Sequence, residues 1–181
     1  MSTAVVSQPS TLDLEAPSPE WRDLAIALVG PAAVGACVGW PSGGTPLLVM
    51  SGLVPLSFLI VGALTLPGLY VGSALMGAAP PARVMSRVAI GAFKDQGLVF
   101  LGLTPAMLFL CATSTDVYEA LVVGTIGVFL GAMVGVRVFF LRLSRVTEDA
   151  HLAWAFALWA IVSAFLGWEV YLEMLNLGGL S

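Results

Sequence analysis

Charged residues are scarce in this sequence. Aspartate, glutamate, lysine and arginine together make up 10% of the 181 residues, whereas hydrophobic residues make up 59%. A soluble domain carries about 25% charged residues on average. The composition therefore excludes an ordinary soluble domain and indicates an integral membrane protein. At this length we expect one compact helical bundle with short tails and no separate soluble domain.

Residues that perform chemistry are also few. The chain has two cysteines, Cys37 and Cys111, and one histidine, His151. The cysteines fall within apolar segments and show no metal-binding or redox spacing, so we expect buried free thiols. The sequence shows no Ser-His-Asp set, no phosphate-binding glycine loop and no block of basic residues. We therefore expect a protein that is not an enzyme, holds no metal or cofactor and binds no nucleic acid.

The first residues lack the features of a secretory signal. Positions 1–22 contain three prolines with acidic and hydroxyl residues, but no basic start followed by an apolar core. This composition is typical of a disordered segment. We predict a disordered acidic cytoplasmic tail over 1–22 and a transmembrane helical domain over 23–177.

Five apolar segments in the rest of the chain are long enough, or nearly so, to cross a membrane. The hydrocarbon core of a bilayer is about 30 Å thick, so a spanning helix needs about 20 apolar residues. We therefore predict an all-α polytopic transmembrane bundle of about five spans. The expected spans are 24–40, 47–76, 97–113, 120–141 and 152–172.

The segment before the third span has a different pattern. Basic residues Arg83, Arg87 and Lys94 alternate with apolar residues at helical spacing. A basic amphipathic helix of this kind is typical of the membrane interface, where its cations contact lipid headgroups. We predict a separate interfacial helix over about 81–95. The alternative is a cytoplasmic extension of the third span.

The basic residues also predict an orientation. With five spans, the N-terminal tail and the connections 77–96 and 142–151 share one side of the membrane. All seven lysine and arginine residues fall on or next to that side, while the opposite loops carry Asp116 and Glu119. Basic residues near span ends collect in the cytoplasm. We expect the N-terminus inside, the C-terminus outside and, by default, a bacterial inner membrane.

Glycines recur at intervals of four within the spans. Gly127, Gly131 and Gly135 share one face of the fourth span, and Gly68 and Gly72 repeat the pattern in the second. In lipid, small residues let helix backbones approach closely, which supplies much of the association energy. These faces therefore predict helix packing, either within the chain or with a second copy. The pair at 35 and 39 shows the same spacing.

Two features place charge in or near apolar spans. Arg137 lies near the cytoplasmic end of the fourth span and can extend to the headgroups, or it can pair with Glu148 or Asp149. Glu169 and Glu173 lie four apart, late in the fifth span. They indicate a solvated helix end, with binding of a cation as the functional alternative.

Aromatic residues and prolines complete the pattern. Trp168 and Tyr171 flank the two glutamates and indicate the interface belt. Prolines lie inside the first three spans, at positions 31, 55, 67 and 105. Proline kinks a helix and frees a carbonyl group, and broken helices form substrate sites in transporters. The nearby serine and threonine hydroxyls can also bond those carbonyls, so packing alone explains the prolines.

Two short motifs resemble an uncharacterised bacterial family of small five-span membrane proteins. They are ALTLPGLYVGSALMG at 63–77, which precedes the basic segment, and GLTPAMLFLCATS at 102–114. Pro67, Leu69, Tyr70 and Pro105 are the matching positions. The five-span layout with the N-terminal tail inside also resembles the Yip1 superfamily of trafficking-associated proteins. The resemblance implies an architecture and no catalytic or binding residues.

The sequence leaves two functional hypotheses. The first is a noncatalytic membrane anchor or scaffold subunit that packs with itself or with other membrane proteins and contacts the lipid bilayer. The second is a small transporter or channel, with the kinked helices lining a path and the two glutamates at its outer mouth. A polar cavity that reaches the middle of the membrane would favour the second hypothesis.

Overall fold

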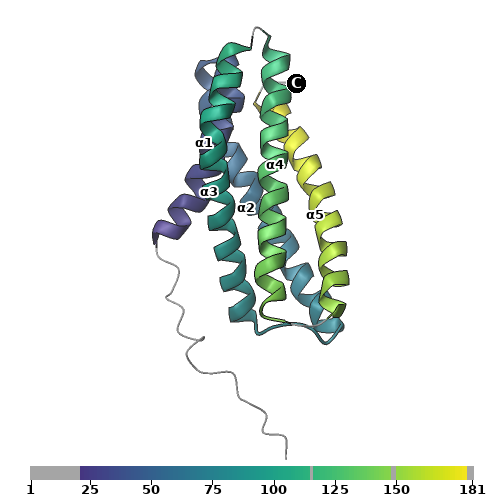
Figure 1. Ribbon diagram of the computed structural model, residues 1–181. Helices are drawn as coiled ribbons and strands as arrows, with labels where there is room; N and C mark the ends of the chain where they lie inside the picture. The colour runs from purple at the N-terminus through teal and green to yellow at the C-terminus, as the bar shows by residue number, and fades with distance from the viewer. Residues whose placement is uncertain (1–20, 115, 148–149, 179–181) are drawn as a thin grey trace, which may run out of the picture.

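The computed structural model describes residues 21–114, 116–147 and 150–178, and within these ranges it contains helices and no strands (Figure 1). Each of the five long helices is long and apolar enough to cross a membrane, which confirms the all-α five-span bundle. They are α1 (Trp21–Gly39), α2 (Gly44–Leu75), α3 (Ala82–Thr113), α4 (Val117–Ser144) and α5 (Ala150–Leu177). A short 3-10 helix, η2 (Trp40–Ser42), follows α1.

The prediction of a separate interfacial helix over 81–95 is wrong. These residues form the first half of α3, which continues without interruption to Thr113. The alternative, an extension of the third span, is the one observed. The helix continues because no proline lies between Pro81 and Pro105. The polar residues Lys94 and Asp95 at the junction are also paired with neighbouring helices rather than left to end the helix.

The prolines do not break the helices that contain them. Pro31 lies inside α1, Pro55 and Pro67 inside α2, and Pro105 inside α3. A proline removes one backbone hydrogen bond, but the turns on either side keep theirs. The broken spans considered from the sequence are therefore absent from the helices that the structure describes.

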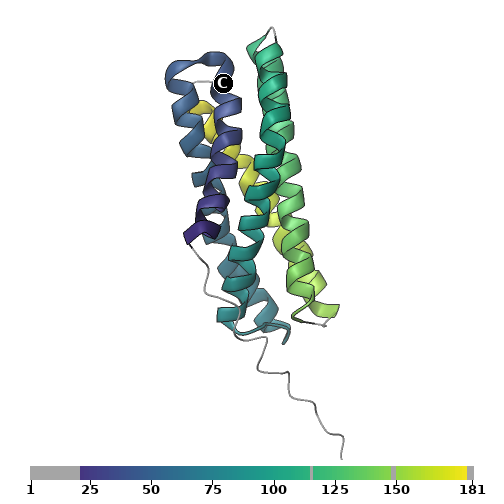
Figure 2. The ribbon, with the colours of Figure 1, turned by 60° about the vertical axis from the view of Figure 1, so that its left-hand side comes forward.

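The backbones of α4 and α5 are less closely packed than those of the other neighbouring long helices. Helix α1 packs against α2 and α3, while α3 packs along α4 and α2 packs along α5. The backbones of α4 and α5 come close at few positions, although side chains such as Phe139 and Phe156 bridge the two helices. Helix α5 runs obliquely across the bundle (Figure 2). The bundle therefore has one side where two neighbouring helices are joined only loosely.

Two separate clusters of buried side chains form the core. The first contains residues of α1, α2, α3 and α4 and of the end of α5, among them Val34, Phe100 and Met174. The second joins the other half of the bundle and includes Leu69 and Phe139. Residues of both clusters line a cavity between α2, α3, α4 and α5.

Candidate functional site: a lateral cavity between four helices

The glycine face of α4 is buried against α3 within the same chain. Gly127, Gly131 and Gly135 are all buried. A Cβ added to each would overlap, in turn, the side chains of Met107, Phe100 and Gln96. All three neighbours belong to α3. The sequence left open whether this face packs within the chain or against a second copy. The structure shows that it packs within the chain.

The glycine pair of α2 faces outward. A Cβ added to Gly68 or Gly72 would meet no atom within 4 Å. Gly68 is exposed and Gly72 is partly exposed. At this position, the two glycines therefore do not pack against another helix within the described part of the chain.

A close contact between two helix backbones involves glycines that the four-residue spacing does not predict. Gly30 of α1 and Gly97 of α3 face each other, and a Cβ on either would overlap the other helix's backbone. Gly35 makes a similar contact with the backbone at Met50 of α2. Gly30 and Gly97 lie on different helices and each lacks a glycine four residues away. No spacing rule could therefore connect them.

One predicted interfacial cation, Lys94, takes part in a contact between helices instead, and a second ion pair lies next to it. Lys94 of α3 forms an ion pair with Asp23 of α1, with 2.5 Å between nitrogen and oxygen. Asp95 accepts a hydrogen bond from Nε of Arg142 at 3.0 Å, which joins α3 to α4. These pairs connect the start of α1 and the end of α4 to the middle of the long α3 helix.

The remaining predicted interfacial cations are exposed. Arg83 and Arg87 project from the first turns of α3, and Arg137 projects from α4. No described residue forms an ion pair or hydrogen bond with Arg137. Its suggested partners, Glu148 and Asp149, lie outside the described residues. The pairing proposed for Arg137 therefore stays a prediction.

The two glutamates of α5 lie on the surface. Glu169 and Glu173 are exposed, and Glu173 accepts a hydrogen bond from Asn176 at 3.5 Å. Neither lines the cavity. Within the described ranges there is no cluster of three histidine, cysteine or acidic residues that could hold a metal ion.

Tyr171, which the sequence assigns to the interface belt, is buried among the helices. Its side chain is 5% exposed, and its hydroxyl is 2.8 Å from the hydroxyl of Thr125 on α4. This hydrogen bond is a specific link between α4 and α5. Trp168 is exposed, and its ring lies against Phe129 of α4.

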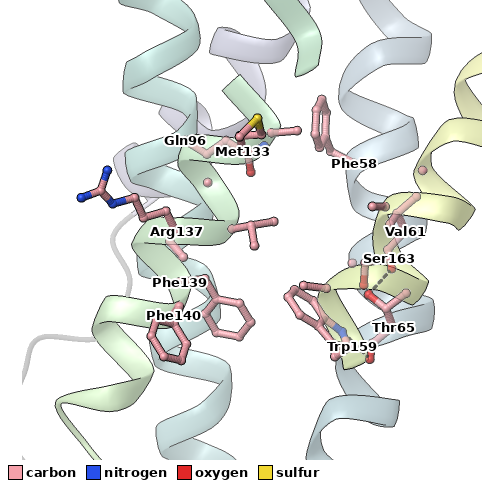
Figure 3. A pocket seen from close by; sticks show the side chains of 18 of the residues that line it. Phe58, Val61, Thr65, Gln96, Met133, Arg137, Phe139, Phe140, Trp159 and Ser163 are labelled. Atoms are coloured by element: carbon pink, nitrogen blue, oxygen red, sulfur yellow. Dashed lines mark hydrogen bonds between the residues drawn. The ribbon is translucent and has the colours of Figure 1, made fainter. Parts of the chain in front are cut away.

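The cavity has a volume of about 850 Å³ and lies between the α3–α4 pair and the α2–α5 pair (Figure 3). It exists because α5 packs along α2 and α4 along α3, while the backbones of α4 and α5 stay apart and side chains such as Phe139 and Phe156 bridge them. Met133 of α4 and Ile161 of α5 line it and are each 68% exposed. The cavity therefore opens sideways between these two helices, where a membrane protein faces lipid.

Most of the lining is apolar or aromatic. More than half of the chain's aromatic residues contribute, from all four helices. Trp159 spans the wall between α5 and α2, where its indole N–H donates a hydrogen bond of 2.9 Å to the Thr65 carbonyl. Arg137 lies at the rim, but its guanidinium group points away from the cavity (Figure 3).

Two polar side chains in the cavity make no hydrogen bond with any described residue. Ser163 of α5 is 9% exposed, and its buried hydroxyl has no partner. Gln96 of α3 is 8% exposed, and its side-chain amide also lines the cavity. Ser57 and Thr65 differ, because their hydroxyls donate to the carbonyls of Val54 and Val61 in their own helix.

The sequence did not single out Ser163 or Gln96. Ser163 is an isolated polar residue in an apolar segment, which is a signal that could have been used, whereas Gln96 directly follows Lys94 and Asp95. Their convergence on one cavity depends on how α3 and α5 are placed, and no sequence spacing encodes it. Comparison of the chain with protein-family models, with curated proteins and with solved structures finds no match.

Proposed function

We propose that this protein is a noncatalytic integral membrane component that binds a lipid-soluble molecule in the lateral cavity between α4 and α5. The observation that carries the proposal is the cavity itself, at about 850 Å³ and open toward the lipid side. Ligand sites are typically concave and mostly apolar, with volumes of about 300–1,000 Å³ and a few placed polar groups. The lining described above has these properties.

The chemistry of the lining supports binding rather than conduction. The cavity is lined in part by α2, α3 and α5. A polar path between these three helices would favour a transporter. Its surface is instead dominated by apolar side chains, and the charged group at its rim, Arg137, points away (Figure 3). Glu169 and Glu173, the proposed outer mouth, lie outside the lining. An ion crossing this cavity would lack the polar partners that replace its hydration shell.

The proposal is tested by filling the cavity. Ala132 lines it from α4, so Ala132→Phe places a ring inside it. Ala106 of α3 is exposed and lies outside the lining, so Ala106→Phe is the matched control. Protein purified in mild detergent is extracted with organic solvent, and the extract is analysed by mass spectrometry. We expect a co-purifying apolar molecule in the wild type and in Ala106→Phe, and its loss from Ala132→Phe.

Either of two results would contradict the proposal. One is a wild-type protein that carries no apolar molecule and binds none when it is reconstituted. The other is an Ala132→Phe protein that is folded and carries the same molecule at the same stoichiometry as the control.

A second candidate function is the anchor or scaffold role suggested by the sequence. The observation that favours it is the outward glycine face of α2, where Gly68 and Gly72 have open space around them. A helix of a second copy or of another membrane protein fits such a face, because small residues permit close backbone approach. The resemblance to small five-span membrane proteins with a Yip1-like layout agrees with this role and stays a prediction.

The orientation belongs to the same proposal. Arg83 and Arg87 project from the end of the bundle at which α3 begins, and Arg142 and Arg145 lie where α4 ends. These two helix ends lie side by side at one end of the bundle (Figure 1). The positive-inside rule then supports a cytoplasmic N-terminus and an external C-terminus. The bacterial inner membrane stays the default assignment for a helical bundle of this kind.

A further inference from the structure

We propose that the ligand of the lateral cavity is a neutral, lipid-soluble quinone. In this arrangement its ring lies between the aromatic walls, and its two carbonyl oxygens accept hydrogen bonds from Ser163 and Gln96. This inference rests on the proposed function, since it assigns a chemical class to the molecule that the cavity binds.

The first argument concerns charge and access. The cavity opens between Met133 and Ile161, so its ligand arrives through the bilayer. The guanidinium of Arg137 points away from the cavity, and no lysine, aspartate or glutamate among the described residues lines it (Figure 3). Burying a charged group without a partner is costly. The ligand is therefore uncharged as well as lipid-soluble.

Two polar side chains, Ser163 and Gln96, line the cavity and have hydrogen-bonding capacity that no described residue uses. Ser163 lies on the α5 wall and Gln96 on the α3 wall, on opposite sides of the cavity (Figure 3). The fully buried Ser163 hydroxyl has no hydrogen bond, which is rare and costly because the hydrocarbon region provides no water to compensate. The serine hydroxyl and the glutamine amide can both donate. A ligand with an acceptor oxygen at each of two opposite edges satisfies both.

The third argument concerns the shape of the walls. Phe58, Phe93, Phe139, Phe156 and Trp159 line the cavity from four different helices. Aromatic rings attract other flat rings in offset-stacked or edge-to-face arrangements. A flat ring is therefore favoured over a bare acyl chain, which gains nothing specific from aromatic walls. A quinone combines the ring, the two opposed carbonyl oxygens, the neutrality and the apolar tail.

The binding test uses decyl-benzoquinone, a short-chain quinone, with the purified full-length protein in detergent. Trp159 and Trp168 line the cavity, so bound quinone quenches their fluorescence. We expect saturable quenching in the wild type. Ser163→Ala and Gln96→Leu are each expected to weaken binding by about tenfold, as expected for one lost hydrogen bond. Ser57→Ala is the matched control, because Ser57 lines the cavity but its hydroxyl already bonds Val54.

The outcomes separate the ligand class from the proposed function. Ser163→Ala removes a hydroxyl without a partner, so it is expected to fold, and thermal unfolding checks each variant. Saturable quenching that both variants weaken and Ser57→Ala leaves unchanged supports the proposal. Equal affinity in all four proteins overturns it. Displacement of the quinone by equimolar dioleoylglycerol overturns the quinone class but leaves the cavity as a lipid site. Binding of neither molecule overturns both proposals.

Discussion

Gly30 of α1 and Gly97 of α3 bring the backbones of their helices into direct contact. A Cβ on Gly30 would overlap the carbonyl group of Gly97, and a Cβ on Gly97 would overlap that of Ile26. The neighbouring ion pair joins Asp23, two turns before Gly30, to Lys94, one turn before Gly97. Two features therefore fix the position of the first span along the longer third span. One is the contact between two glycines, which have a hydrogen atom in place of a Cβ, and the other is the ion pair.

The first prediction concerns this contact. Gly97→Ala is expected to lower the free energy of unfolding by about 1–3 kcal/mol, because the added methyl group meets rigid backbone and forces the helices apart. Gly102→Ala, in the same helix, is the control, since its Cβ would meet nothing within 4 Å. It is expected to be neutral or stabilising by up to ~1 kcal/mol through helix propensity. Thermal or denaturant unfolding in detergent measures both. Equal stability of the two variants would contradict the observed packing.

The second prediction separates the two glycine faces. Gly131→Ile is expected to lower stability by about 1–3 kcal/mol or more, because the side chain collides with the buried ring of Phe100. Gly68→Ile is expected to leave folding unchanged, because its site is open. If the scaffold role is correct, Gly68→Ile weakens association with the partner or the second copy. Unfolding curves and cross-linking in native membranes measure the two effects. A Gly131→Ile protein of normal stability would contradict packing by this face.

The third prediction concerns orientation. In a background with Cys37→Ala and Cys111→Ala, a cysteine is introduced in place of Ser86 on α3 or Tyr118 on α4, both of which are exposed. A membrane-impermeant maleimide applied to intact bacterial cells is expected to label Tyr118→Cys directly. Ser86→Cys is expected to react only after the cells are permeabilised, because the basic end of the bundle faces the cytoplasm. The reverse labelling pattern would invert the proposed topology.

Hydropathy alone predicted the class of protein, the all-α fold and the number of spans. It did so because a helix that crosses a bilayer needs about 20 apolar residues whatever it packs against. The spacing of Gly127, Gly131 and Gly135 likewise predicted a packing face, since residues four apart share one side of a helix. These are local properties that a short window of sequence contains in full.

The length of α3 was harder to predict. The pattern of Arg83, Arg87 and Lys94 indicates an amphipathic segment. Such a segment can be a separate interfacial helix or the continuation of a span, and the pattern fits both equally well. The contacts decided between them, because Lys94 and Asp95 are held by Asp23 and Arg142 on neighbouring helices. Those partners lie 71 and 47 positions away in the sequence. No local pattern indicates such pairs.

The sequence by itself determined that this chain is a five-helix membrane bundle with glycine packing faces. Only the tertiary structure decided that α3 fills the glycine face of α4, and that α4 and α5 leave a cavity between them. It also brought Ser163 and Gln96 to opposite walls of that cavity. The physical reason is that apolar side chains gain similar energy from lipid and from other helices. Close backbone fit therefore selects the partners, and that fit is a property of the assembled helices.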